Sequence, residues 1–115
     1  MLKEIETLLN KEVFLTASLS EQSRELYTQL ISNLGKGEAS CIALAKFTKG
    51  TVVTDDRAAR QTCVDLELSY TGTLGILKAC VPDGTILVEK ADGLLEQMIS
   101  QGFYSPVRRI SDILP

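Results

Sequence analysis

The 115-residue sequence contains no histidine and only three cysteines. Without an imidazole the chain cannot carry a Ser-His-Asp or Cys-His catalytic system, a histidine zinc site or imidazole acid-base chemistry. The cysteines are odd in number and widely spaced, a pattern that predicts reduced, buried thiols rather than disulfides or zinc ligands: Cys41, Cys63 and Cys80. Any chemistry must therefore depend on carboxylates, hydroxyls, lysine or arginine.

Long apolar runs and an excess of positive charge are also missing. No stretch is long enough to cross a bilayer, and the first residues lack the apolar core of a signal peptide, so we expect a cytoplasmic protein without membrane association. The net charge of −3 and the pI near 4.9 argue against a general nucleic-acid-binding surface, which needs clustered Lys and Arg, although a local basic patch is compatible with them. With 44% hydrophobic residues, a chain of this length predicts one globular domain over residues 1–115.

A short apolar run followed at once by two carboxylates is the most informative stretch of the sequence. Thr51–Val53 is β-branched throughout, as in a strand covered on both faces. Asp55 and Asp56 follow it, and apolar residues at helical spacing then predict a helix over 57–66. Ligands bind in open α/β sheets where strands end and helices begin, so the two carboxylates could hold a divalent cation. One of them could instead cap the helix, and the motif alone favours the cap.

Alternating helical and strand patterns occupy the rest of the chain. Ser18 with Glu21 forms a capping-box signature for a helix that should end at Gly35, and Thr73 is the expected N-cap of a later helix. Ser105 with the following proline predicts the start of a final helix. Further helices are predicted over 2–9, 38–45, 74–80 and 90–101, with short strands at 13–15 and 69–70. This order predicts an α/β fold in which helices flank a small parallel sheet.

Three segments, in this order and at these spacings, resemble the C-terminal part of PIN-domain proteins. They are Gly37-Glu38-Ala39, Thr54-Asp55-Asp56-Arg57-Ala58-Ala59-Arg60 and Thr71-Gly72-Thr73-Leu74-Gly75-Ile76-Leu77. More narrowly, they resemble the DUF3368 group of toxin-like PIN proteins, and the resemblance covers about the last 80 residues. Together the three segments are fairly specific, whereas each one alone would be weak.

This resemblance implies a magnesium- or manganese-dependent ribonuclease, often the toxin of a toxin-antitoxin pair. Glu38 would match the acid at the start of the mid-chain helix, and Asp56, or alternatively Asp55, the acid after the next strand. Thr54 would match a position that often carries a hydroxyl. Cations held by such carboxylates can activate a water for phosphodiester cleavage. Arg57 and Arg60 lie one helical turn apart and could meet an RNA phosphate or an acidic antitoxin-like partner, or simply be solvated.

One departure from the family weakens the expectation of activity. PIN domains open with an apolar strand ending in Asp, and a second acid follows on an early helix, whereas Met1–Asn10 offers only Glu4 and Glu6 in a polar helical segment. We therefore expect a truncated, incomplete PIN-like domain that lacks this first strand and binds magnesium or manganese weakly. It would be either a reduced ribonuclease or a catalytically inactive remnant that binds partners. The exposed sheet edge should be covered by a homodimer, or within one chain by Val13-Phe14-Leu15.

Overall fold

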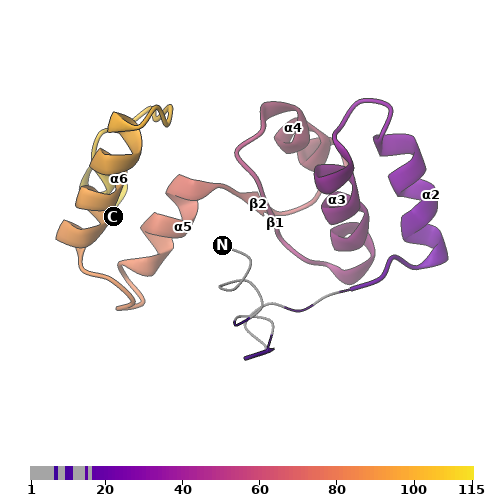
Figure 1. Ribbon diagram of the computed structural model, residues 1–115, viewed down its shortest axis with the longest axis horizontal. Coiled ribbons are helices and arrows are strands. Elements are labelled where there is room, and N and C mark those ends of the chain that lie inside the picture. The colour runs from indigo at the N-terminus through magenta and orange to yellow at the C-terminus, as the bar shows by residue number, and fades with distance from the viewer. Residues whose placement is uncertain (1–6, 8–9, 12–14, 16) are drawn as a thin grey trace.

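The computed structural model describes residues 7, 10, 11, 15 and 17–115 (Figure 1). Their helices and strands, labelled as in Figure 1, are α2 (Glu21–Leu30), α3 (Lys36–Thr48), β1 (Val52–Val53), α4 (Arg57–Asp65), β2 (Tyr70–Thr71), α5 (Thr73–Cys80), α6 (Val88–Ser100) and the 3-10 helix η1 (Ile110–Ile113). The predicted helix over 2–9 and strand at 13–15 lie largely outside the described residues.

Strands β1 and β2 form a parallel sheet, with Val52 opposite Tyr70 and Val53 opposite Thr71. The N–H of Val52 donates to the carbonyl of Ser69 at 3.0 Å. Helix α4 connects the two strands, as a parallel pair requires. The predicted α/β fold, a small parallel sheet flanked by helices, is therefore confirmed. Because backbone groups alternate between the two sides of a strand, the Val53 N–H points away from β2.

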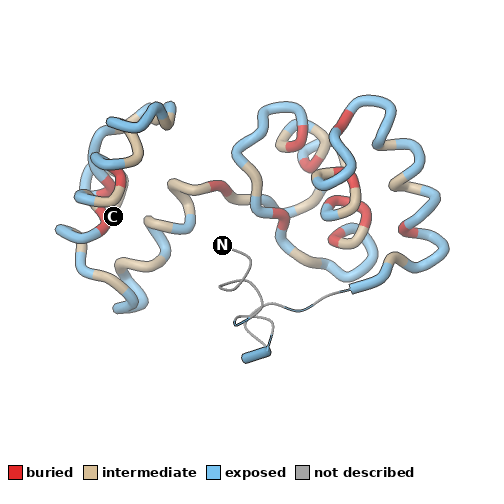
Figure 2. The backbone as a smooth tube through the Cα atoms, in the orientation of Figure 1, coloured by how far each residue is buried: buried red, intermediate tan, exposed pale blue. Residues whose placement is uncertain are grey.

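The most buried residues lie in two separate parts of the backbone (Figure 2), and their apolar side chains form two cores. The first lies in what we call the sheet lobe, α2 to β2, and is built from Leu34, Ala39, Ile42, Ala45, Val52, Ala59 and Cys63. The second lies in what we call the C-terminal lobe, α5 to η1, and is centred on Ala91, Leu95 and Ile110. Small side chains at Ala39 and Ala43, both fully buried, let α3 pack closely in the sheet lobe.

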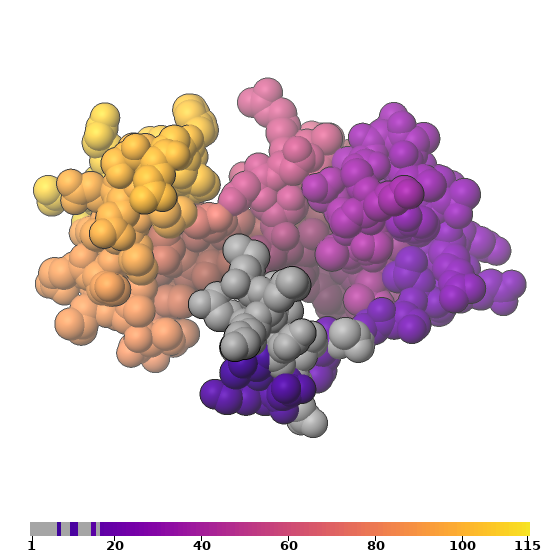
Figure 3. Space-filling view, in the orientation of Figure 1, coloured from indigo at the N-terminus to yellow at the C-terminus, as the bar shows by residue number. Residues whose placement is uncertain are grey.

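The contacts between the two lobes are concentrated where β2 leads into α5. In Figure 3 the yellow and orange C-terminal lobe stands apart from the sheet lobe along the upper edge.

Several local predictions from the sequence are wrong in detail. Ser20, not Ser18, caps α2: its hydroxyl accepts the N–H of Ser23 at 3.1 Å. The N-cap of α5 is Gly72, and Thr73 is the first helical residue. No helix begins at Ser105, because its hydroxyl bonds both the N–H and the carbonyl of Val107 and so stabilises a local turn.

The cysteines follow the prediction in part. All three are free, and Cys63 is fully buried, which raises the pKa of its thiol. Cys41 is exposed, contrary to the prediction, although Ala45, one turn further along the same side of α3, is buried.

Candidate functional site at the end of strand β1

Asp56 caps the helix that follows β1. Its Oδ2 accepts the backbone N–H of Ala59 at 2.9 Å, and its own N–H donates to the Thr54 hydroxyl at 3.1 Å. A carboxylate in this position satisfies a helix N–H that has no partner within the helix and also meets the positive end of the helix dipole. The prediction that one Asp of the pair caps this helix is confirmed for Asp56.

Asp55 makes the corresponding contact with a different helix. Its Oδ1 accepts the N–H of Thr73, the first residue of α5, at 2.9 Å, and the Thr73 hydroxyl donates to its Oδ2 at 2.5 Å. Arg60 Nη2 lies 3.3 Å from Oδ1. The Thr73 hydroxyl, the Thr73 N–H and the Arg60 charge together hold the pKa of Asp55 below its ordinary value. Asp55 therefore joins the end of β1 to the start of the C-terminal lobe.

Arg60 and Gly72 complete this junction. The Arg60 Nε donates to the carbonyl of Thr54 at 3.2 Å, and its guanidinium lies 5.9 Å from the centre of the Tyr70 ring. Gly72 is buried, and a Cβ there would collide with Arg60 Nη2 and Asp55 Oδ1 and lie 3.1 Å from the Thr54 carbonyl. Gly72 and Thr73 are thus part of the site, although the sequence analysis predicted Thr73 only as a helix cap and placed both residues in the third PIN-like segment without a role in the site. The signal was available, because the ends of neighbouring parallel strands meet at one edge.

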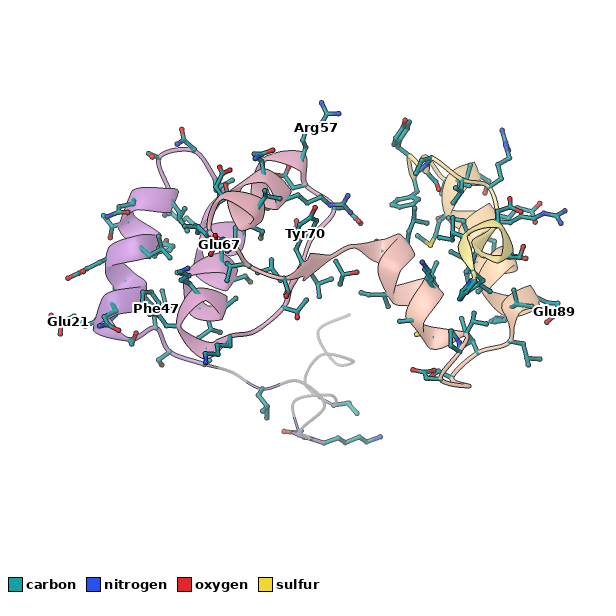
Figure 4. The ribbon with its side chains drawn as sticks, turned by 180° about the vertical axis from the view of Figure 1, so that it is seen from behind. Glu21, Phe47, Arg57, Glu67, Tyr70 and Glu89 are labelled. Atoms are coloured by element: carbon teal, nitrogen blue, oxygen red, sulfur yellow. The ribbon has the colours of Figure 1, made fainter. Side chains whose placement is uncertain are left out.

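Glu38 and Arg57 are less closely tied to this junction. Glu38 is half-buried in the first turn of α3, and its carboxylate lies over Gly35, with Oε2 2.9 Å from where a Cβ would stand. Arg57 is exposed and projects away from α4 (Figure 4). Within the described part of the chain, no three Asp, Glu, Cys or His side chains are close enough to hold a metal ion. Glu38, Asp55 and Asp56 therefore do not form a three-carboxylate group here.

A cleft of about 520 Å³ adjoins the junction on the side of α4. The sheet lobe contributes charged and polar groups to it, and the other wall comes from the segment after α6. Its lining consists of Asp55, Arg57, Arg60, Gln61, Val64, Tyr70, Leu74, Phe103, Tyr104 and Pro106. The cleft thus combines two arginines with aromatic rings, of which Tyr104 is 88% exposed.

The family model of DUF3368, described as a PIN domain, matches residues 2–115. The chain belongs to the PIN-domain family. This confirms the resemblance seen in the sequence and identifies a nuclease-like domain in general terms. No curated protein and no solved structure matches the chain. In the described residues, no helix is long and apolar enough to cross a membrane.

PIN domains generally use divalent metals, and Asp55 and Asp56 are the residues at this corner that could hold such an ion. Magnesium and manganese need several carboxylate or water oxygens around one point. Both oxygens of Asp55 already accept hydrogen bonds, and Asp56 uses Oδ2 as a cap. Since no third acidic group joins them within the described residues, this set by itself does not fit a divalent-cation site.

Proposed function

We propose that this PIN-domain chain is a nuclease-like module, related to the metal-dependent ribonucleases of toxin-antitoxin systems, that binds partners without efficient phosphodiester cleavage. One observation carries the proposal: the adjacent carboxylates of Asp55 and Asp56 cap two different helices. Each of these hydrogen bonds takes up a lone pair of the carboxylate and fixes its orientation toward a helix N–H, which leaves the pair less available to hold a cation or position a water. The acidic pair therefore contributes mainly to the structure of the corner.

Binding remains chemically well supported at the same place. Arg57 has no acidic partner among the described residues, and Arg60 shares its guanidinium between Asp55 and the Tyr70 ring. Arginine beside aromatic rings suits a single-stranded RNA, because phosphates bind guanidinium groups and bases stack on rings. We propose the cleft as the RNA-binding surface, with an acidic antitoxin-like protein as the competing ligand of the same arginines.

The free edge of β1 supports association with another chain. Val53 is 61% exposed, and its N–H points away from β2, toward the side where the described residues place no further strand. Unpaired strand edges bind extended segments of other chains. We propose that a second copy pairs along this edge to form a homodimer.

A metal-dependent ribonuclease is the alternative function, and the position of the acids at the carboxyl end of a parallel strand favours it. Asp56, Asp55 and Glu38 would then hold magnesium or manganese, with the Thr54 hydroxyl beside them and further acids supplied from elsewhere. Such a sparse site would bind the ion at roughly millimolar affinity. In the ribonuclease the Asp pair would be needed for cleavage of RNA, whereas in the binding module it would only stabilise the corner.

Cleavage of single-stranded RNA in magnesium or manganese separates them. The test compares the wild type with Asp56→Asn, since Asn is also a good N-cap and should keep α4 intact. The matched control is Asp112→Asn, an exposed Asp in η1. We expect no metal-dependent cleavage that Asp56→Asn removes, together with salt-sensitive RNA binding. Robust cleavage that Asp56→Asn abolishes and Asp112→Asn leaves unchanged would establish the enzyme and refute the binding module.

A manganese titration followed by NMR gives a second, independent readout. At millimolar ion, paramagnetic broadening centred on Glu38 and Asp56 would support the metal site. Broadening confined to other surface carboxylates would remove that assignment.

A further inference from the structure

Helix α6 carries a glycine that packing within the chain does not explain. Gly93 is exposed in the middle of the helix, and a Cβ there would meet no atom of another element within 4 Å. Apart from proline, glycine is the least favourable residue in a helix interior. A glycine is useful where another backbone or a ligand approaches closely. Gly93 therefore marks a place on α6 where the helix backbone is open to such an approach.

Gly93 lies in a second cavity, of about 640 Å³, on the C-terminal lobe. The helix contributes one stripe of residues spaced three or four positions apart: Glu89, Gly93, Glu96 and Ser100. Arg108 and Arg109, in the segment that leads into η1, line the same cavity from outside the helix. Glu89 lies on the side of the C-terminal lobe that faces away from the sheet lobe (Figure 4). This cavity, which we call the α6 groove, shares no lining residue with the cleft beside Asp55.

The two sides of the α6 groove carry opposite charges that do not meet. Within the described residues, no hydrogen bond or ion pair joins the two glutamates of the stripe to Arg108 or Arg109. Those carboxylates can still accept hydrogen bonds, and the guanidinium groups can still donate them. The groove thus offers unused hydrogen-bonding groups of both signs.

A fixed contact holds these two sides in place. The oxygens of Asp92 accept the N–H and the hydroxyl of Ser111, both at 3.0 Å, and so join η1 to α6. The hydrogen bonds from Ser111, together with the nearby charge of Arg109, hold the pKa of Asp92 below its ordinary value. The arginines that precede η1 are thereby positioned against α6 before any ligand arrives.

The length of the groove suits an extended peptide. From Glu89 to Ser100 the stripe extends about 16 Å along the helix, a distance that about five residues of extended chain cover. Successive side chains of an extended chain point to opposite sides. In a peptide that lies over Gly93, one set of side chains would face the glutamates and the other set the arginines. The complementary sequence therefore alternates basic and acidic residues, whereas a polycation or a polyanion would suit only one side.

We propose that the α6 groove binds an extended peptide segment of a partner protein in which basic and acidic residues alternate. Gly93 lets the peptide backbone approach the helix. The glutamates of α6 bind the basic side chains, and Arg108 and Arg109 bind the acidic ones. This interaction does not depend on RNA binding in the cleft beside Asp55.

An NMR titration of the full chain with a blocked Lys-Glu-Lys-Glu-Lys peptide tests the proposal. The control peptide, Lys-Lys-Lys-Glu-Glu, has the same composition and net charge without the alternation. We expect shifts of the amides of Gly93, Glu96 and Arg108, with those of Tyr70 and Tyr104 in the cleft unchanged. The dissociation constant should lie below about 1 mM at low salt and rise as salt is added. The control peptide should bind at least roughly fivefold more weakly, because only part of its charge can face the correct side.

Variants separate binding from folding. Gly93→Gln places a long side chain in the groove and is a better helix former, so the dissociation constant should rise roughly tenfold while Tm is equal to or above that of wild type. Ala79→Gln, at an exposed position of α5, is its matched control. Glu96→Lys and Arg108→Glu should each weaken binding roughly fivefold. Glu25→Lys, an exposed acid of α2, should leave it unchanged.

Four results would overturn the proposal. The first is a wild-type chain whose groove amides do not shift at millimolar peptide. The second is equal affinity for the alternating and the control peptide, which would indicate unspecific attraction between charges. The third is wild-type affinity in Gly93→Gln and in both charge variants. The fourth is a single-stranded RNA oligonucleotide that shifts Gly93 and Arg108 when the peptide does not, because the groove would then be a nucleic-acid surface.

Discussion

Replacement of Asp55 by alanine should destabilise the junction between the two lobes. The change removes the acceptor of the Thr73 N–H, the acceptor of the Thr73 hydroxyl and the ion pair with Arg60. Loss of a helix cap costs about 1 kcal/mol, and the second hydrogen bond with a half-exposed ion pair adds about 1 kcal/mol more. The expected loss is therefore about 2 kcal/mol, or roughly 8 °C in Tm for a domain of this size.

Urea and thermal unfolding of Asp55→Ala, Asp55→Asn and wild type measure this effect. The Asn variant keeps one oxygen that can accept the Thr73 N–H, so it should fall between the other two. Asp112→Ala is the control, since Asp112 is exposed and no side-chain hydrogen bond ties it to another element. An Asp55→Ala chain within about 0.5 kcal/mol of wild type, the usual range for an exposed substitution, would show that the contact with Thr73 contributes little.

The same contact predicts a specific dependence on pH. Hydrogen bonds from the Thr73 hydroxyl and N–H, with Arg60, make the pKa of Asp55 lower in the folded chain than in the unfolded chain. The stabilisation is therefore complete above the unfolded-state pKa and is lost as the pH falls through the folded-state pKa. Between about pH 6 and about pH 3, wild type should lose more unfolding free energy than Asp55→Asn. Equal losses in the two proteins would refute the assignment.

Three further predictions address packing and exposure. Gly72→Ala should destabilise the chain by about 1–3 kcal/mol, because its Cβ meets Arg60 and Asp55. Gly93→Ala, in open space on α6, should instead stabilise it by about 0.5–1 kcal/mol. Paired thermal melts measure both changes, and a change of stability in the same direction for the two variants would contradict this. Leu95→Ala should cost about 2–5 kcal/mol and raise amide exchange in α5 and α6 more than in the sheet lobe. Uniform acceleration would show one cooperative core instead. With a thiol reagent Cys41 should react at once and Cys63 only on unfolding, and the reverse order would contradict the burial of Cys63.

Local signals in the sequence were sufficient for the sheet and for the helix after it. A β-branched run marked β1, and a carboxylate followed by helical spacing placed α4 to within one residue of its end. The strand was recognised from its β-branched composition, although its pairing with β2 spans 18 residues, and the helix depends on interactions between residues at most four positions apart. Periodicity captures such interactions directly.

Contacts between residues far apart in the sequence could not be predicted from it. The hydrogen bond between Asp55 and Thr73 spans 18 residues. Periodicity shows which side of a helix is buried, but it does not show which of the two cores that side joins. Leu74 and Leu77 were therefore recognised as helical, although nothing in their spacing assigns them to a separate C-terminal lobe. Ser20 rather than the predicted Ser18 caps α2, because the Ser20 hydroxyl contacts both the N–H and the hydroxyl of Ser23.

The placement of two helix caps on neighbouring residues has a consequence for mutational scanning. In a chain with two cores, we expect most substitutions to disturb one lobe more than the other. Changes at Asp55 and Asp56 act on the first turns of α4 and α5 together, and changes at Gly72 act on the contacts between them. A scan for abundance in cells would therefore single out this corner even if the chain never cleaved RNA. Strong selection on an Asp pair in a nuclease-like family is usually attributed to catalysis, and in this protein folding alone would produce it.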